Sequence, residues 1–339
     1  MKFDKEIHYY HIQKYIKIQK TSIIISKEKR NLKTAFIIPA YNEEGAIGKT
    51  IDNAHMTIPN SEVFVCDNNS TDLTKDEAIR SGAKVITEPK KGKGNAMRKL
   101  FNYVDADIYI MVDGDNTYNL QYLTSAIEYF IQNDLDLMTG NRFAMKSKSY
   151  MRKGHEIGNK IFTKLLTYLC NVETSDIFSG LRIMSRRFVD SFPIVSSEFE
   201  IETEISVFAS KMKFASKDFP TEVKSRQNTK SKLNTYKDGF KIIYFIIHLL
   251  HREFPMKLYL PLSLIQSSCS IIFLIGIYAE FLSTGLVERF PTLIVSSLLL
   301  LSSLITFSVG LILKGLVNIK YEHRYLAYRS SKRIFNRSS

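Results

Sequence analysis

The sequence predicts an α/β protein with a mainly parallel sheet, followed by an interfacial helix and a pair of membrane-spanning helices. Three observations lead to this fold class. Short apolar runs alternate with segments of helical period between residues 34 and 112. Acidic and amide residues follow the apolar runs directly. Two long runs without any charged residue lie near the C-terminus.

The predicted elements of the first half form a βαβαβαβ order. The expected strands are Thr34–Ile38, Glu62–Cys66, Lys84–Thr87 and Ile108–Val112. The expected helices are Gly45–Met56, Thr71–Ser81 and Lys93–Val104. Such an order places helices on both faces of the sheet, and ligands then bind beyond the carboxyl ends of the strands. Residues 1–33 precede this domain, which we place at 34–236, as an extension without a chemical motif.

Two uncharged segments predict a transmembrane hairpin over residues 258–317. Leu258–Ala279 and Phe290–Leu313 each reach the length of about 20 residues that crosses a bilayer as a helix. Only the short link Glu280–Arg289 separates them, so we expect two antiparallel spans. A buried core helix is the alternative, but core helices seldom run this far without a polar face.

The charges beside the spans predict their orientation. The tail, residues 318–339, carries Lys320, Arg324, Arg329, Lys332, Arg333 and Arg337 against the single acid Glu322. Positive flanks stay in the cytoplasm, so both termini and the large polar domain are expected there. No apolar stretch near Met1 is long enough for a signal peptide.

The amino-acid composition limits the classes of partner that we expect for this protein. The formal charge is +13, from 47 Lys and Arg against 34 Asp and Glu, which favours an anionic partner. No aromatic and basic reader motif is present, so nucleic acid is not expected. The three cysteines, Cys66, Cys170 and Cys269, cannot all pair within one chain and favour a reducing compartment.

Residues 237–257 predict an amphipathic helix that lies in the membrane interface. Lys237, Lys241, His248 and Arg252 recur at spacings of four, seven and four, which is one helical stripe. Apolar residues fill most of the remaining positions. A core helix is the alternative interpretation of the same pattern.

The sequence Asp113-Gly114-Asp115 follows the fourth expected strand and is the main candidate for chemistry. Two carboxylates one residue apart can share a hard divalent cation, Mg²⁺ or Mn²⁺, and bridge it to a diphosphate. An acidic turn without a ligand is the alternative. The position after a buried strand favours the metal site.

Two further groups fall at the same edge of the sheet. Asp67 ends the second strand, where a carboxylate can accept hydrogens from a nucleoside, although the following Ser70 and Thr71 also suit a helix cap. Lys91 and Lys93 lie among glycines before the third helix and suit a phosphate. The glycine spacing does not match a dinucleotide loop.

These motifs together resemble the family 2 glycosyltransferases of the GT-A fold. The residues concerned are Pro39–Glu44 (PAYNEE), Cys66–Asp72 (CDNNSTD), Lys91–Ala96 (KGKGNA) and Asp113–Asp115. Later segments agree, namely Gly140–Arg142 (GNR), Asp176–Arg182 (DIFSGLR), and Arg226 with Ser231–Leu233 (SKL). Within the family the chain is similar to the polyprenyl-phosphate glycosyltransferases of the dolichol-phosphate mannose synthase type.

The resemblance implies roles for particular residues. Tyr41, Asn42, Glu43 and Asp67 would hold the nucleotide, and Asp113 and Asp115 the cation. The full set of candidate substrate-binding residues is Pro39, Tyr41, Asn42, Glu43, Asp67, Lys91, Lys93, Asp113, Gly114, Arg142 and Arg182. One departure concerns Asn68 and Asn69, where many members carry a second acid and a glycine.

The second half of the domain supplies cations for an acceptor phosphate. A lipid monophosphate is already anionic near neutral pH and needs positioning and neutralisation rather than a general base. The cations are Arg142, Arg152, Arg182, Arg226 and Lys232, for each of which a structural salt bridge is the alternative. We predict that Arg226 and Lys232 act in catalysis together with Asp113 and Asp115.

The leading hypothesis is a membrane-bound inverting transfer of a sugar from a nucleotide-diphosphate sugar to a polyprenyl phosphate. A glycosyltransferase with a hydroxyl acceptor is one alternative, although polysaccharide synthases of that kind carry a QxxRW motif and this chain has no tryptophan. A nucleotide-sugar-binding membrane protein without activity is another. A homo-oligomer is compatible with the sequence, which does not require one.

Overall fold

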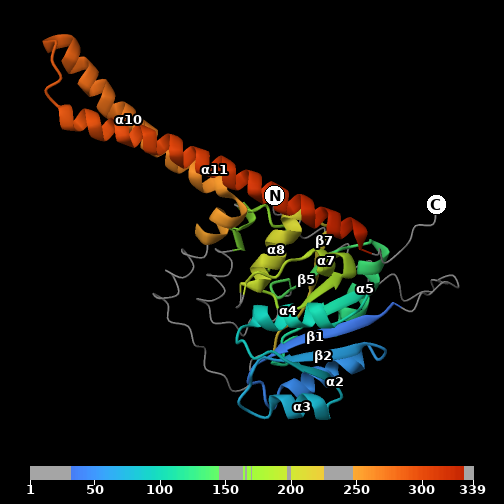
Figure 1. Ribbon diagram of the computed structural model, residues 1–339. Helices are drawn as coiled ribbons and strands as arrows, with labels where there is room; N and C mark the ends of the chain where they lie inside the picture. Colours follow the sequence, from blue (N-terminus) through green and yellow to red (C-terminus); the bar gives the residue numbers. More distant parts are fainter. Residues whose placement is uncertain are drawn as a thin grey trace. The chain divides into compact units, whose positions relative to one another are not determined.

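The computed structural model describes residues 32–144, 163–164, 166–168, 170–196, 200–224 and 247–331. The chain divides into two compact units, of which the first comprises residues 1–228 with 327–339 and the second Thr229–Leu326. We describe each unit by itself. Figure 1 shows the ribbon with its labelled elements.

A seven-stranded sheet forms the centre of the first unit (Figure 1). Its strands are β1 Thr34–Ala40, β2 Glu62–Asp67, β3 Lys84–Thr87, β4 Ile108–Met111, β5 Leu137–Asn141, β6 Arg182–Ser185 and β7 Ser216–Pro220. Its helices are α2 Ile47–Thr57, α3 Thr74–Arg80, α4 Lys93–Tyr103, α5 Leu123–Gln132, α7 Arg186–Ser191 and α8 Ile201–Met212.

The strand order is β3-β2-β1-β4-β6-β5-β7. Strands β1 to β4 pair in parallel, and β5 pairs in parallel with β7, whereas β6 runs antiparallel to both β4 and β5. The expected α/β fold with a mainly parallel sheet is therefore confirmed. All four predicted strands and all three predicted helices are present, with ends that differ by no more than three residues.

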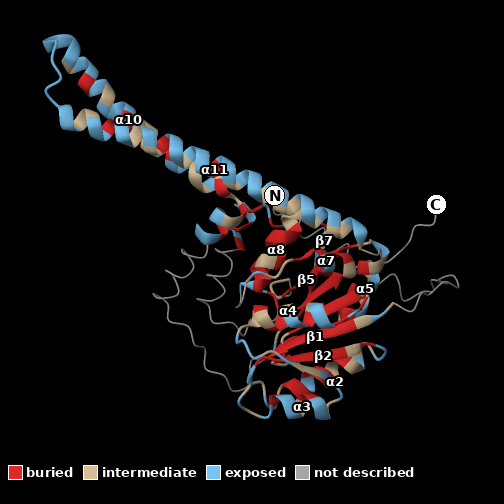
Figure 2. Ribbon diagram, in the orientation of Figure 1, coloured by how far each residue is buried: buried red, intermediate tan, exposed pale blue. Residues whose placement is uncertain are grey.

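The hydrophobic core of the first unit includes β1, which lies between β2 and β4 in the sheet. Ala35, Phe36, Ile37 and Ile38 are fully buried in succession, because helices cover both faces of a parallel sheet. Figure 2 shows the buried strands β1 and β2 in red. Helix α4 packs on β1 and β2, and α3 packs on β2 and β3.

The chain reverses its direction across the sheet next to β1. From β1 it proceeds outward to β2 and β3, and after α4 it returns to β4 on the other side of β1. Right-handed crossovers then place α4 on the face opposite to α2 and α3. Open α/β sheets bind ligands at such a reversal, beyond the carboxyl ends of the strands. The loops after β1, β2 and β4 meet there.

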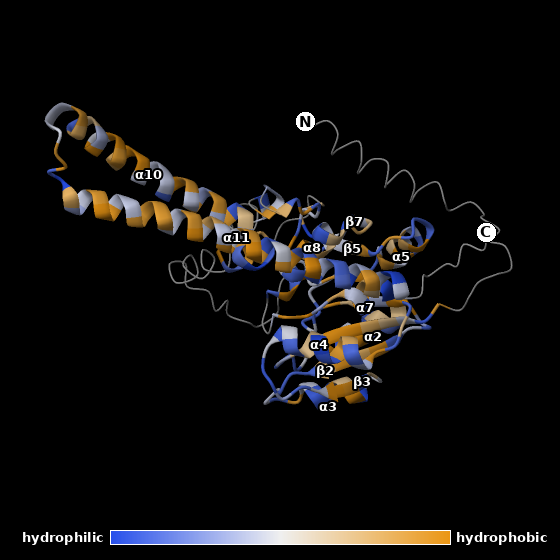
Figure 3. Ribbon diagram, turned by 45° about the horizontal axis from the view of Figure 1, so that its top comes forward, coloured by the Kyte–Doolittle hydropathy of each residue, from blue (hydrophilic) through white to orange (hydrophobic). Residues whose placement is uncertain are grey.

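Two long antiparallel helices form most of the second unit, to which the second of them belongs as far as Leu326. These are α10, Pro255–Thr284, and α11, which begins at Phe290 and ends at Ser330. Both are long and apolar enough to cross a membrane, and only 17% of the most apolar window of each is buried. Figure 3 shows apolar residues along both helices. Each helix extends beyond the predicted span, because residues on either side also favour helix.

Small residues line the contact between α10 and α11. Besides Pro255 at its start, α10 buries Ser263, Ser270 and Ile277, and α11 buries Ser296, Ser303 and Gly310. Their spacing of seven residues is the repeat of a left-handed pair of packed helices. The Ser270 hydroxyl donates to the Ser296 carbonyl oxygen at 2.6 Å. Close packing of small residues is the usual basis of helix association in membranes.

Only part of the predicted interfacial helix lies within the described residues. Residues 247–253 are helical and include His248 and Arg252 of the predicted stripe, whereas Lys237 and Lys241 lie outside the described residues. Glu253 ends this segment and is 4% exposed. Its carboxylate accepts hydrogen bonds from Lys320 Nζ at 2.6 Å and from the Tyr321 hydroxyl at 2.7 Å. These bonds tie the segment to α11 within the second unit.

Candidate active site

Asp113 and Asp115 lie in the turn directly after β4, where the sequence predicted the main chemistry. Asp113 Oδ1 accepts a hydrogen bond from Lys93 Nζ at 2.5 Å. Asp115 Oδ1 accepts from the backbone N–H and the hydroxyl of Thr117, at 3.2 and 2.7 Å. The turn thus presents two carboxylates, of which Asp113 pairs with an ammonium and Asp115 accepts two hydrogen bonds from Thr117.

Helix α2 holds this turn in place through two hydrogen bonds. The Thr50 hydroxyl donates to the Gly114 carbonyl oxygen at 3.1 Å, and Asn53 Nδ2 donates to Asn116 Oδ1 at 2.8 Å. Gly114 is buried, and a Cβ there would lie 3.2 Å from the Ile47 side chain. The turn therefore approaches α2 too closely for a larger residue to fit without movement.

The loop after β1 is bound closely to the loop after β2. Asn42 adopts a left-handed backbone conformation, with φ 53°, and its amide oxygen accepts from the Thr71 N–H at 2.9 Å. The Asn42 N–H donates to Ser70 Oγ at 3.1 Å, and the Glu43 N–H donates to Thr74 Oγ1 at 2.7 Å. The two predicted nucleotide-binding segments thus form one structural unit.

Pro39 and Asp67 lie at the ends of the two strands. Pro39 is buried inside β1 opposite Cys66, so the strand continues past the residue at which it was expected to end. Asp67 is 4% exposed and pairs in register with Ala40. Its Oδ1 accepts from the Ser70 N–H at 3.3 Å. Asp67 therefore lies at the strand tip, as the sequence predicted.

Asn68 fixes the glycine-rich loop that precedes α4. Its amide nitrogen donates to the carbonyl oxygens of Glu88 and Lys90, at 3.1 and 2.7 Å. Its amide oxygen accepts from the Gly92 N–H at 2.7 Å, and Gly92 has a φ of 125° that favours glycine. A carboxylate could not donate the first two bonds. The departure from an acidic pair thus has a structural reason.

Lys91 and Lys93 have different surroundings. Lys91 is exposed, and its Nζ lies 2.9 Å from the Tyr41 hydroxyl and 4.8 Å from the centre of that ring. The side chain of Lys93 is 9% exposed, and its Nζ lies 2.5 Å from both Asp113 Oδ1 and Glu202 Oε1. Burial alone would lower the pKa of Lys93, but the two carboxylates outweigh it and raise that pKa.

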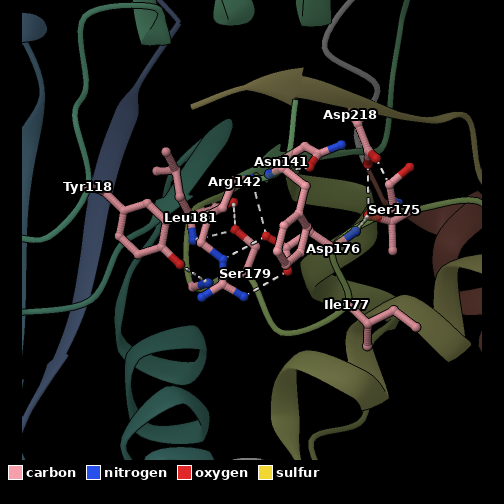
Figure 4. A network of polar contacts seen from close by, with 12 residues as sticks. Tyr118, Asn141, Arg142, Ser175, Asp176, Ile177, Ser179, Leu181 and Asp218 are labelled. Atoms are coloured by element: carbon pink, nitrogen blue, oxygen red, sulfur yellow. Dashed lines mark hydrogen bonds and ion pairs between the residues drawn. The ribbon is translucent and has the colours of Figure 1, made fainter. Parts of the chain in front are cut away.

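Arg142 is held by Asp176 in the network of Figure 4. Its Nε and Nη2 donate to the two carboxylate oxygens at 2.6 and 2.7 Å, and the backbone N–H of Arg142 adds a third bond at 3.2 Å. The Asp176 side chain is fully buried. Burial opposes the charge of Arg142, yet the hydrogen bonds to Asp176 raise its pKa. The salt-bridge alternative thus describes Arg142 in this structure.

Arg182 is fully buried. Its guanidinium donates to the carbonyl oxygens of Ile177, Ser179 and Glu202 and to the Ser206 hydroxyl, at 2.7 to 3.1 Å. These bonds join the loop before β6 to helix α8. We therefore assign Arg182 a supporting position rather than a contact with substrate. Arg152, Arg226 and Lys232 lie outside the described residues.

Comparison with known proteins identifies the family. The model of glycosyl transferase family 2 matches residues 35–192. Protein RfbJ of Shigella flexneri is 47% identical over 121 residues, which cover 36% of this chain and 94% of RfbJ. This chain belongs to glycosyl transferase family 2. A dolichyl-phosphate hexose transferase of Haloferax volcanii is 30% identical over 155 residues, 46% of this chain and 67% of that protein.

Solved structures share the fold of this family 2 glycosyltransferase. Glucosyl-3-phosphoglycerate synthase of Mycobacterium tuberculosis, crystallised with Mn²⁺, UDP and glucosyl-3-phosphoglycerate, aligns with a TM-score of 0.53 and 21% identity. The alignment covers 65% of this chain and 80% of that chain. At this identity the likeness supports the GT-A fold alone.

The carboxylates of the glycosyltransferase turn fit a hard divalent cation. Asp113 and Asp115 offer only oxygen ligands, which Mg²⁺ and Mn²⁺ prefer. Among the described residues no group of three or more His, Cys, Asp or Glu side chains is placed to hold a metal. A cation bound here would therefore complete its shell with water and the diphosphate of a donor, as is usual for Mg²⁺.

The structure adds two residues to the site that sequence reasoning did not single out. Glu202, at the start of α8, is 5% exposed, and its Oε2 has no hydrogen-bond partner among the described residues. Gly180 lies against Asp113, because a Cβ on Gly180 would overlap the Asp113 carboxylate. The sequence contains a signal for the burial of Glu202, because Ile205 and Ala209 follow it at spacings of three and seven residues, which is one helical face. Both of these residues are buried.

Proposed function

We propose that this glycosyltransferase moves a sugar from a nucleotide-diphosphate sugar to a polyprenyl phosphate at a membrane surface. The observation that carries the proposal is the presence, in one chain, of a family 2 domain and two long helices with exposed apolar surfaces. An enzyme anchored in this way meets an acceptor whose chain remains in the bilayer. The similarity to the dolichyl-phosphate hexose transferase supports the same acceptor class.

The donor would bind at the carboxyl ends of β1, β2 and β4. In this proposal Tyr41, Asn42, Glu43 and Asp67 hold the nucleoside, while Lys91 and Lys93 face the diphosphate. Asp113 and Asp115 hold Mg²⁺ or Mn²⁺, which when bound neutralises charge on the departing diphosphate. The short Thr117 bonds keep Asp115 oriented without adding a competing charge.

The acceptor phosphate needs no general base, because it is already ionised near neutral pH. One of its oxygens attacks the anomeric carbon while the bond from that carbon to the diphosphate oxygen breaks, with inversion. We propose Arg226 and Lys232 as the cations that position this phosphate. In this structure Arg142 binds Asp176 through Nε and Nη2, so in this proposal it positions the loop before β6.

The proposed topology follows from the hairpin and its flanking charges. Both helices cross the membrane, and the domain and both termini lie on the cytosolic side, where the basic tail is retained. The interfacial helix of residues 237–257 would lie between the domain and the first span. A homo-oligomer is compatible with this arrangement, and nucleic acid has no part in it.

A hydroxyl acceptor in glycan synthesis is the second candidate. Glu202 is the observation behind it, because its Oε2 has no hydrogen-bond partner among the described residues and could accept a proton from a hydroxyl that came within hydrogen-bond reach. The relatives also include a low-salt glycan biosynthesis hexosyltransferase, which is 28% identical over 216 residues. A polyprenyl-phosphate acceptor would carry the transferred sugar into the lipid fraction, whereas a hydroxyl acceptor in a glycan would leave it in the water-soluble fraction.

The test uses membranes that contain the full-length protein. They are incubated with radiolabelled UDP- and GDP-sugars and with undecaprenyl or dolichyl phosphate, with and without Mn²⁺, and the lipids are then extracted. The proposal predicts label in the lipid fraction that depends on both the polyprenyl phosphate and the cation. Label only in water-soluble glycan would favour the hydroxyl acceptor. Absence of any donor turnover would support a binding protein without activity.

A further inference from the structure

Lys93 lies where a cation at Asp113 would have to bind. Its ammonium is 2.5 Å from Asp113 Oδ1 and 2.5 Å from Glu202 Oε1, so it is shared between two carboxylates. The Lys93 and Glu202 side chains are 9% and 7% exposed, which leaves little water to weaken the pairs. The Asp113 side chain, at 28%, is open enough for a ligand to approach.

The second oxygen of Asp113 is also restricted. It lies so close to Gly180 that a Cβ on that glycine would overlap it. Among the described residues, Oδ1 of this carboxylate therefore accepts from an ammonium, and Oδ2 lies against Gly180. A divalent cation on Asp113 Oδ1 would be repelled by the Lys93 ammonium, which lies 2.5 Å from that oxygen, so movement of the ammonium would favour coordination.

The surroundings allow Lys93 to move while its backbone stays in place. Lys93 is the first residue of α4, directly after Gly92, whose N–H is held by Asn68. The four-carbon stem of lysine is flexible and its ammonium is a point charge without a fixed hydrogen-bonding plane. Lys93 is the one ammonium that these ion pairs place between the two carboxylates of Asp113 and Glu202, and Glu202 Oε2 is buried without a hydrogen-bond partner among the described residues.

We propose that the Lys93 ammonium occupies the cation position at Asp113 in the absence of donor. It neutralises Asp113 before the donor binds and moves away when the donor arrives. In the exchange the Lys93 ammonium turns to the diphosphate, and the divalent cation takes its place on Asp113. Cation and nucleotide then bind cooperatively, and the cation alone binds weakly. This inference rests on the proposed function, because it assumes a nucleotide diphosphate at the site.

The experiment measures binding of Mn²⁺ alone to purified full-length protein by electron paramagnetic resonance of the free ion. Lys93→Met is expected to bind Mn²⁺ about tenfold more tightly than wild type, a change within the usual range of coupling between two ligands. Adding UDP or GDP should raise the Mn²⁺ affinity of wild type strongly and that of Lys93→Met much less.

Two further variants distinguish displacement of the Lys93 ammonium by the cation from a general effect of removing a positive charge. Lys91→Met removes a charge from the same loop, but Lys91 contacts Tyr41 instead of Asp113, so Mn²⁺ affinity should stay at the wild-type value. The double variant Lys93→Met with Glu202→Gln keeps the net charge of the cluster and avoids leaving two buried carboxylates unpaired. It should still bind Mn²⁺ more tightly than wild type.

The result that overturns the proposal is a folded double variant that binds Mn²⁺ no more tightly than wild type, with folding confirmed by circular dichroism. Lys93 would then be a structural ion pair. Failure of the proposed function has a different signature, namely a wild-type protein that transfers no sugar from any donor. The comparison of Mn²⁺ affinities does not depend on that transfer, so the two failures are distinguishable.

Discussion

Gly180 shows how a single residue without a side chain positions the acidic turn. Its N–H donates to the Tyr118 hydroxyl at 2.6 Å, which holds the glycine against Asp113. We predict that Gly180→Ala leaves the fold intact but pushes the Asp113 carboxylate aside. A displacement of about 1 Å in a reacting site costs about a hundredfold in rate. The transfer rate and the circular dichroism spectrum of the variant test this.

Gly276→Ala is the matched control for this substitution. It also adds one methyl group to a glycine, but nothing lies within 4 Å of a Cβ at Gly276. Its transfer rate should therefore equal that of wild type. An active Gly180→Ala variant would show that the position of Asp113 does not limit the reaction.

Cys66 offers a test of burial at the strand end beside Asp67. The residue is fully buried in β2, and burial, with the nearby charges of Glu88 and Asp67, raises the pKa of its thiol to about 12. At pH 8 the reactive thiolate is then only about one part in ten thousand. We predict that native protein resists alkylation of Cys66 by iodoacetamide at pH 8.

The measurement is mass spectrometry of the Cys66 peptide before and after unfolding in guanidinium. The same peptide should be alkylated fully once the chain is unfolded, because its thiol then has an ordinary pKa. Modification of Cys66 at equal rates in native and unfolded protein would contradict the buried environment described here.

At the scale of elements, Gly310 is a point of close contact between the two helices of the hairpin. A Cβ on Gly310 would lie 2.7 Å from the Cβ of Tyr259, whereas nothing lies within 4 Å of a Cβ on Gly315. We predict that Gly310→Leu destabilises the pair of helices by about 1–3 kcal/mol, the usual cost of overpacking. Gly315→Leu, on the same helix, should have little effect.

The stability of the hairpin can be followed by thermal unfolding of the full-length protein in detergent. Gly310→Leu is expected to unfold at a lower temperature than Gly315→Leu, although both variants add the same side chain. Equal unfolding temperatures would mean that α10 and α11 do not pack through their small residues.

The elements that the sequence predicted are those with local signals. In the first half, each predicted strand is a short run that contains apolar residues, and β1, β2 and β3 pair in the order in which they follow one another along the chain. Strand β6 has no such signal. It is only four residues long, and it pairs antiparallel with β4 and β5, of which β5 ends 41 residues earlier in the chain. Short strands with distant partners leave little pattern in sequence.

The same distinction applies to the candidate site. Asp113 and Asp115 form a local motif at a strand end, so their position was predictable. Glu202 and Gly180 reach the same carboxylate from segments more than 60 residues away, and only the folded chain shows that they meet. The buried contacts of Arg142 and Arg182 were likewise not evident, because a basic residue in sequence does not reveal its partner.

On the scale of the whole molecule, charge and hydropathy are distributed unevenly. The net charge of +13 belongs to a chain whose two long apolar helices carry few charged residues over their most hydrophobic windows. A basic protein with such helices suits an anionic substrate presented at a membrane. In the proposed function, the acidic turn after β4 is the feature on which sugar transfer to a lipid phosphate depends most.

Asp115→Asn tests that claim most directly. An amide is a much poorer ligand for a hard cation than a carboxylate, and loss of about 3 kcal/mol of transition-state stabilisation lowers the rate about a hundredfold. Asp52→Asn, an exposed acid of α2, is the control. We predict that Asp115→Asn forms lipid-linked sugar as slowly as wild type does in the presence of EDTA. Asp52→Asn should form it at the wild-type rate. Wild-type rates in Asp115→Asn, or in excess EDTA, would contradict this prediction.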